Sequence, residues 1–330
     1  MVEDTPGIHH VTGIVGDAQP SLDFYADVLG LRLVKRTVNH EDILRHHLYY
    51  GNETGALGSL FTAFPYPGDP PGRVGKPQVA AVGFAVPPGS LDYWTSRLEG
   101  RGVDPEYRER FDGTVLRFED PDGTHVELVA GESPLDPWES GPVPAESAIR
   151  GIHGVTVLPT NPYATASTLE TLGFDLVGEE PEPAGKDGAE GSAGYSGTRV
   201  RYRAPGDVAT VVDLLDRDVA YGREGPGTLH HVAVRVGSEA ELFEWHDLFR
   251  ERDYHVSRVR DRIYYRSIYV RGPGGVLFEL ATEGPGLAVD EPGAPETMGE
   301  SLVLPDWAEE DREMIESQLP PISPPRVEST

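Results

Sequence analysis

The chain has 330 residues and a formal net charge of -27, from 55 Asp and Glu against 28 Lys and Arg. Its length allows two ordinary domains with sizeable cores. It contains no cysteine, which excludes disulfides and thiolate metal sites. A chain this negative is also a poor partner for nucleic acid.

Most of the basic residues are arginine, and lysine occurs only at positions 35, 76 and 186. An acidic surface poor in lysine is typical of proteins adapted to very high salt, where screening removes self-repulsion. An ordinary acidic cytosolic protein is the alternative. No run of 18 apolar residues and no signal-peptide pattern occurs, so we expect a cytoplasmic protein with no membrane partner.

Four segments of the chain begin alike, with a short apolar strand, a helical pattern and then further strands. This repeat predicts an α+β fold of four βαβββ modules arranged as two double-module domains. We expect one domain over residues 1–133 and the other over 150–283. A Pro- and Gly-rich linker would cover 134–149, and an acidic tail over 284–330 would carry one short helix. The four opening strands are 8–11, 80–83, 152–155 and 229–232.

Each module carries a helix with recognisable ends. Asn161 and Pro162 suit the cap and first position of the third helix. Ser238 and Glu241 form a capping box that opens the fourth. The expected helices are 21–29, 90–98, 161–172 and the segment from 238, and the run 179–191, rich in acid, Pro and Gly, is predicted to be a solvated loop.

The chemistry of the chain is concentrated at its two ends. Glu279 stands in a strand between Phe278 and Leu280, and a buried carboxylate is costly unless it is paired or bound to a metal. Histidine doublets open the first and the last module, at positions 9–10 and 230–231. Two histidines and one carboxylate are the ligand set of non-haem Fe(II) oxygenases.

The middle modules lack this set. Ala81 and Gly154 stand where the outer modules have His10 and His231. Glu127 lies six residues after its turn proline, as Glu279 does, but has no histidine to accompany it. Asp213 in the third module is out of register unless a gap is allowed. We therefore expect one functional centre from the first and fourth modules and one degenerate centre from the second and third.

These motifs resemble the vicinal oxygen chelate superfamily, which includes glyoxalase I, bleomycin-resistance proteins and extradiol dioxygenases. Within it the chain is most similar to the dioxygenases that cleave hydroquinones and chlorohydroquinones. The resemblance spans essentially the whole chain. The segments that carry it are Gly7-Ile-His-His-Val-Thr12, Arg36-Thr-Val-Asn39, the doublet 230–231 and residues 267–280.

The resemblance implies an Fe(II) centre, with Mn(II) as an alternative, held by His10, His231 and Glu279. An aromatic substrate and O2 would occupy the open coordination positions, and a ring carbon–carbon bond would break. His230, Arg262 and Tyr269 would then serve catalysis. His9 and Thr12 would support the ligands from behind, with His9 and His230 reaching the site from the neighbouring sheet. Assembly into a homo-oligomer stays open.

Two other functions compete with the dioxygenase. A glyoxalase-like isomerase or lyase usually has a fourth protein ligand on the final strand of the first module, where residues 59–64 contain no acid. A non-catalytic binding protein usually lacks a complete triad. His40, His46 and His47 form a cluster without a carboxylate partner, and we expect them to be ordinary strand residues of the first domain, with lining of the pocket as the alternative.

Overall fold

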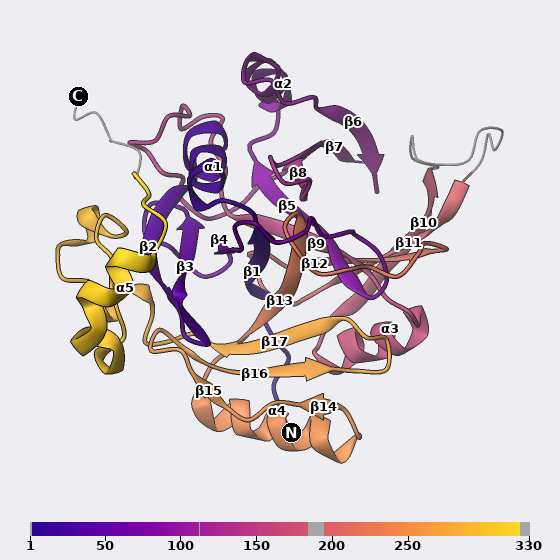
Figure 1. Cartoon of the computed structure of the whole chain (residues 1–330). Coiled ribbons are helices and arrows are strands. Elements are labelled where there is room, and N and C mark those ends of the chain that lie inside the picture. Colours follow the sequence, from indigo (N-terminus) through magenta and orange to yellow (C-terminus); the bar gives the residue numbers. More distant parts are fainter. Residues whose placement is uncertain (1, 112, 184–194, 324–330) are drawn as a thin grey trace.

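The computed structural model describes residues 2–111, 113–183 and 195–323, and it contains the four modules (Figure 1). The first module consists of β1 (Ile8–Val15), α1 (Ala18–Leu22), the π-helix η1 (Asp23–Val28), β2 (Arg32–Asn39), β3 (Asp42–Gly51) and β4 (Leu60–Pro65). The second consists of β5 (Gln78–Val86), α2 (Leu91–Gly100), β6 (Glu106–Arg110), β7 (Gly113–Glu119) and β8 (His125–Ala130).

The third and fourth modules repeat the plan, so the predicted α+β fold of four βαβββ modules is confirmed. The third consists of β9 (Ile152–Leu158), α3 (Pro162–Thr171), β10 (Asp175–Pro183), β11 (Tyr195–Arg203) and β12 (Val211–Arg217). The fourth consists of β13 (Thr228–Val236), α4 (Glu239–Glu251), the short β14 (His255–Val256) and β15 (Arg260–Asp261), β16 (Arg266–Arg271) and β17 (Leu277–Thr282).

The modules pair across the chain and not only with their neighbours in sequence. Strand β1 pairs antiparallel with β13, which joins the first module to the fourth. Strand β5 pairs antiparallel with β9, which joins the second to the third. One antiparallel β-bridge, between Leu229 of β13 and Val79 of β5, links the two sets into one sheet. Each set forms one centre, and the two ends of the chain meet in the first.

The helix ends follow the caps that the sequence provides. The side chain of Asn161 accepts a hydrogen bond from the amide of Ala164, and that of Ser238 accepts from the amide of Glu241. The first helix differs from its prediction, because it begins at Ala18 and continues as a π-helix. The predicted loop 179–191 is also partly wrong, since 179–183 belong to β10, while 184–191 lie outside the described residues.

The tail wraps the outer face of the first module (yellow in Figure 1). Lys35, fully buried on β2, donates hydrogen bonds to Asp290 and Glu291 of the tail. An apolar cluster joins α5 to β2 through Val38 and Ile315. The tail elements are η2 (Leu287–Asp290), η3 (Pro295–Thr297), η4 (Asp306–Asp311) and α5 (Arg312–Gln318). Among the described residues, no helix is long and apolar enough to cross a membrane.

Candidate metal centre

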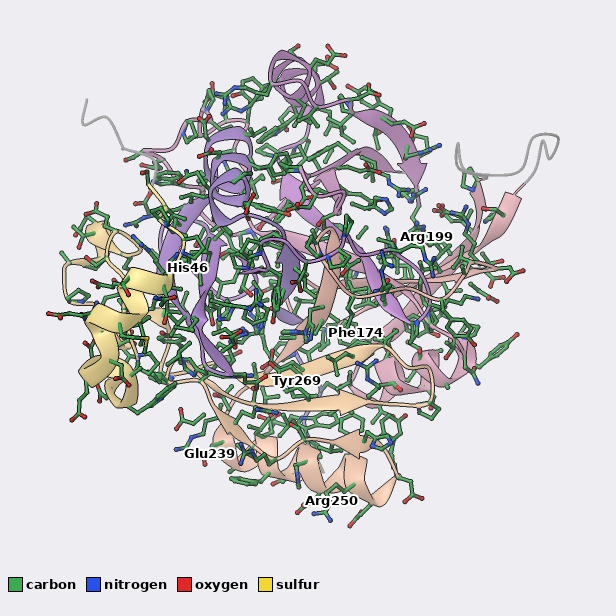
Figure 2. All side chains as sticks on the ribbon, in the orientation of Figure 1. His46, Phe174, Arg199, Glu239, Arg250 and Tyr269 are labelled. Atoms are coloured by element: carbon green, nitrogen blue, oxygen red, sulfur yellow. The ribbon has the colours of Figure 1, made fainter. Side chains whose placement is uncertain are left out.

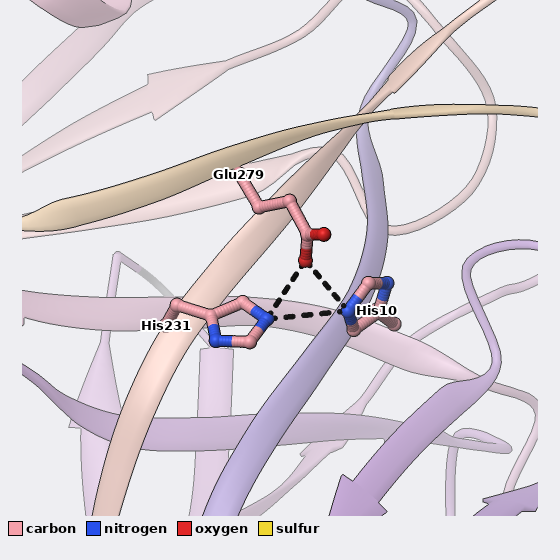
Figure 3. A group of neighbouring side chains, drawn as sticks. All are labelled: His10, His231 and Glu279. Atoms are coloured by element: carbon pink, nitrogen blue, oxygen red, sulfur yellow. Dashed lines mark hydrogen bonds and ion pairs between the residues drawn. The ribbon is translucent and has the colours of Figure 1, made fainter. Parts of the chain in front are cut away.

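Three side chains from distant parts of the chain converge at the centre of the first and fourth modules (Figure 3). The Nε2 atoms of His10 and His231 lie 3.1 and 2.8 Å from Oε2 of Glu279. The two Nε2 atoms lie 3.3 Å apart. Within the described residues this is the only group of three or more His, Cys, Asp or Glu side chains arranged to hold a metal ion.

The strand register explains this convergence. Strands β1, β13 and β17 are neighbours, with β13 antiparallel to β1 and parallel to β17. His10 lies opposite Ala233, which in turn lies opposite Glu279, while His231 lies opposite Thr12. Because side chains two residues apart on a strand share a face, all three candidate ligands point into the same space.

The three side chains fit a metal ion. Both carboxylate oxygens of Glu279 are buried, and Oε2 faces only the Nε2 atoms of the two candidate ligand histidines, while Oε1 has no hydrogen-bond partner, a state that is costly without a cation. The three ligand atoms stand at neighbouring separations of 2.8 to 3.3 Å. Three adjacent corners of an octahedron with bonds of about 2.1 Å have nearly this spacing, and such a set leaves other corners open.

The protonation states agree with metal binding. Burial lowers the pKa of His231 to about 4, so this imidazole is neutral at pH 7. Burial alone would raise the pKa of Glu279, but the nearby imidazoles of His231 and His10 hold it well below its usual range. A neutral imidazole and an ionised carboxylate are the forms that bind metal ions.

The first histidine of each doublet contacts the second directly. The Nδ1 atoms of His9 and His10 lie 2.9 Å apart, and those of His230 and His231 lie 2.7 Å apart. His9 also hydrogen-bonds the backbone of Thr282, which places its proton on Nε2 and leaves Nδ1 to accept from His10. That tautomer leaves Nε2 of His10 free for a metal. His9 and His230 therefore contact the ligands from the same strands, and not from a neighbouring sheet as expected.

The other predicted site residues are distributed around these ligands. Thr12 places its hydroxyl 3.1 Å from Nε2 of His231. The ring of Tyr269, labelled in Figure 2, stands edge-on to that of His231 with centroids 5.3 Å apart. Arg262 donates a hydrogen bond to the Tyr269 hydroxyl at 3.2 Å. All three line the pocket above the ligands, whereas His9 and His230 do not.

Further pocket residues escaped the sequence analysis. Asn39, His40 and His47 line the pocket with Tyr49, Phe64 and Tyr265. The expectation that His40 and His47 are ordinary strand residues is therefore wrong for their position, although His46 does point away and hydrogen-bonds the carbonyl of Pro320. A usable signal was strand alternation, which puts His47 on the same face as Tyr49.

The pocket is narrow. Its open volume is about 10 Å³, so a substrate ring requires its lining to move. Arg262, which lines the pocket, forms an ion pair with the exposed carboxylate of Glu41, and Glu41 also contacts Arg260. A much larger cavity of about 1070 Å³ lies over the other centre, beside Ala81 and Thr156. We place the metal centre at the smaller pocket because only there does a ligand set exist among the described residues.

The second centre has the same strand register with different residues. Gly83, two residues after Ala81, pairs with Glu127, just as Ala233, two residues after His231, pairs with Glu279. Among the described residues, Glu127 belongs to no group of three or more side chains arranged to hold a metal ion. Asp213 pairs with Thr156, two residues after Gly154, so it stands at the Glu279 position. It lies eight residues after its turn proline and not six, so the gap that the sequence comparison required is present in this turn.

A guanidinium occupies the middle of this second centre. Arg199 hydrogen-bonds Asp213 at 3.1 Å, Glu182 at 2.8 Å and Thr156 at 2.9 Å, and it is 2% exposed. The positive charge of Arg199 thus compensates carboxylates that a metal would otherwise hold. Arg110, also buried, lies 3.3 Å from Glu182 and adds a second cation. The degenerate centre is a buried ionic network.

Comparison with known proteins agrees with this architecture. The profile of the Glyoxalase/Bleomycin resistance protein/Dioxygenase superfamily matches residues 7–128 and 168–280, and the chain belongs to this superfamily. It is 42% identical over 323 residues to "Putative ring-cleaving dioxygenase MhqO" of Bacillus subtilis, across 97% of this chain and 98% of that protein. It is 34% identical to the chlorohydroquinone/hydroquinone 1,2-dioxygenase of Sphingobium indicum, across 98% of each.

Solved structures give the same result. A crystal structure of a Bacillus subtilis "putative dioxygenase" is 40% identical with a TM-score of 0.90, covering 98% of this chain and 99% of that one. Glyoxalase I from Zea mays has a TM-score of 0.59 at 16% identity, covering 84% of this chain and 92% of that one, which shows a shared fold alone. The full-length similarity to ring-cleaving dioxygenases makes the chain an enzyme of that kind.

Proposed function

We propose that this enzyme uses Fe(II), with Mn(II) as an alternative, to open the ring of a hydroquinone-like para-diol with O2. The cleavage would be of extradiol type, because the broken bond lies beside one oxygen-bearing carbon and not between two. The similarity to the chlorohydroquinone/hydroquinone 1,2-dioxygenase of Sphingobium indicum supports both the para-diol and the position of cleavage. His10, His231 and Glu279 would hold the metal.

One observation carries the proposal: the position equivalent to Glu279 in the first module is Thr62. It pairs with Thr12, two residues after His10, in the register that pairs Glu279 with Ala233. A glyoxalase-like centre would need an acid there. The Thr62 hydroxyl instead hydrogen-bonds the hydroxyl of Thr12 at 2.9 Å. Three protein ligands leave room for both a substrate oxygen and O2.

When bound, the metal would supply binding positions for both reactants and a path for electrons between them. Arg262 and Tyr269 would stabilise negative charge that develops on oxygen, since a cation and a phenol donor point into the same pocket. Burial raises the pKa of Tyr269, which keeps its hydroxyl protonated as a donor. His9 and His230 would fix the tautomers of the two ligand histidines through their Nδ1 contacts.

Arg262 would move to admit substrate once its exposed ion pair with Glu41 separates, since Arg262 lines this narrow pocket. The reaction balances simply: both atoms of O2 enter the product, one ring carbon–carbon bond breaks, and nothing else is consumed. The product therefore contains all the atoms of the diol and of O2.

Anaerobic loading with Fe(II), followed by oxygen uptake, tests the proposal. We expect one O2 consumed per hydroquinone and a product whose mass is the sum of the two reactants. Iron bound at full stoichiometry with no oxygen uptake on any hydroquinone or catechol would exclude the dioxygenase proposal.

A further inference from the structure

His47 occupies a distinctive place in the pocket. It lies on β3, two residues before Tyr49, and its ring is held between those of Tyr49 and Phe64, with centroids 4.1 and 4.2 Å away. Its Nε2 atom lies 3.0 Å from the hydroxyl of Thr62. Among the described residues its other nitrogen, Nδ1, makes no hydrogen bond, although the side chain lines the pocket.

The strand order places His47 on the wall opposite the catalytic arginine and tyrosine. In the sheet, strand β1 is followed on one side by β4 and then by β3, which carries His47. The other side continues through β17 to β16, which carries Tyr269. Tyr49 pairs with Thr62 as Tyr269 pairs with Glu279, so the two flanks match.

Other polar groups of the pocket have partners of their own, and the hydroxyls of Tyr49 and Tyr265 hydrogen-bond each other. Thr12 contacts a metal ligand, and Arg262 and Tyr269 contact each other. Asn39 accepts a hydrogen bond from the amide of Glu41 in its own turn. His40 packs edge-on against Trp307 of the tail, with centroids 6.0 Å apart. His47 is the polar group of this wall that is anchored near the centre and still offers a free nitrogen.

A para-diol presents its two oxygens at opposite ends of the ring. When one oxygen is at the metal, the other must meet the far wall, where an unpaired buried hydroxyl would be costly. A phenol hydroxyl both donates and accepts, so it can hydrogen-bond Nδ1 in either tautomer of a neutral imidazole. A catechol, with both oxygens adjacent, has no hydroxyl to place there.

We propose, resting on the proposed function, that His47 is a specificity-determining residue that receives the substrate hydroxyl not bound to the metal. It would thereby select para-diols over phenols with one hydroxyl. Its contact with Thr62 uses Nε2 and fixes the ring, which leaves Nδ1 available to the substrate. The site for the second hydroxyl is thus built by the first module, while the fourth supplies Arg262 and Tyr269.

Two substitutions separate the roles of the two ring nitrogens. In His47→Asn the short amide reaches the place of Nδ1, whereas in His47→Gln the longer amide reaches Nε2 and keeps the bond to Thr62. Dissociation constants are measured anaerobically by calorimetry for hydroquinone and for phenol on Fe(II)-loaded protein. His46→Gln is the matched control, because His46 is the adjacent residue and points to the tail.

We expect wild type, His47→Asn and the control to prefer hydroquinone to phenol by about tenfold or more, the scale of one buried hydrogen bond. His47→Gln should lose most of that preference, with phenol affinity nearly unchanged. Retained preference in His47→Gln would overturn the proposal, as would loss in His47→Asn alone. These binding measurements need no ring cleavage, so they fail or succeed separately from the oxygen-uptake test of the dioxygenase.

Discussion

Glu279 and Glu127 occupy equivalent strand positions in the two centres and form a matched pair for a test of metal binding. Glu279→Ala removes the single carboxylate of the ligand set, and we expect iron retained after desalting to fall at least tenfold. Glu127→Ala should keep full iron, because its centre has no histidine ligands. Iron content by elemental analysis decides between them, and equal loss in both variants would contradict the assignment.

Thr62 offers the converse test, since it stands where a fourth ligand would lie. We expect Thr62→Glu to bind metal at least as tightly as wild type but to lose oxygen uptake, because the added carboxylate occupies a position that substrate or O2 needs. Thr62→Val is the matched control: it removes the hydroxyl without adding a ligand, so metal content should be unchanged and activity only partly reduced. Full activity in Thr62→Glu would show that this position does not face the metal.

At the scale of elements, the second centre depends on the consecutive strands β10, β11 and β12, which carry Glu182, Arg199 and Asp213. Burial alone would raise the pKa of both carboxyl groups, but Arg199 lowers the pKa of Glu182, and Arg201 and Arg199 lower the pKa of Asp213 through hydrogen bonds and charge. A carboxyl group with a lowered folded-state pKa adds stability that is present above its unfolded value, about 4, and is lost as the pH falls through the folded value.

We therefore expect Arg199→Met to cost about 3 kcal/mol of unfolding free energy at pH 7, because it leaves buried carboxylates underpaired. The difference in unfolding free energy between wild type and Arg199→Met should decrease as the pH falls from 5 toward 3. Over this range wild type loses the stabilisation that its ion pairs contribute. Urea unfolding at several pH values, at constant salt, measures this difference. A difference in unfolding free energy that increases on acidification would contradict a stabilising role for the ion pairs of Arg199. Arg203→Met, on the same strand and outside these contacts, is the control.

The same strands show where sequence reasoning succeeds and where it stops. The repeat and the caps predicted the modules, because strand alternation and capping residues are local signals. The register of Asp213 could be predicted only with a gap, because distances were counted from the turn proline. Asp213 lies eight residues after Pro205, and the longer turn contains Ala209 at a φ of 54°. The length of this turn depends on its backbone conformation, which cannot be predicted from its amino-acid composition.

The candidate ligands were predictable for a different reason from the pocket lining. His10, His231 and Glu279 are unusual residues at repeated positions, so comparison of the modules finds them. His47 and Asn39 line the pocket only because β3 pairs with β4 and the tail packs against β2. These are tertiary contacts, which one sequence does not reveal. Isolated polar residues in strands carry no such signal in one sequence.

For the whole molecule, the cross-pairing of modules has a consequence for assembly of the site. His10 and His231 are 221 positions apart, yet their strands are adjacent. The metal centre cannot form until both ends of the chain have folded against each other. Long-range pairing of this kind slows folding, because loop closure precedes the contacts that reward it.

The net charge of -27 opposes the packing of the first and fourth modules against each other, because it produces repulsion between acidic side chains. Like charges spread over one surface repel each other, and screening shortens their reach from about 10 Å at 0.1 M salt to about 3 Å at 1 M. If the acidic surface is an adaptation to high salt, the thermal midpoint should rise steadily as KCl is increased from 0.1 M to 2 M. The fold should weaken in dilute buffer, first where the chain ends meet.

Thermal unfolding followed by circular dichroism measures this, with iron content recorded in parallel. Sucrose at matched water activity is the control, because it favours compact states without screening charge. A midpoint that rises more with KCl than with sucrose assigns the additional stabilisation to charge screening. A midpoint that stays constant from dilute buffer to 2 M KCl would show that the buried networks and the metal centre hold the modules together against the repulsion, and the protein would then be an ordinary acidic enzyme.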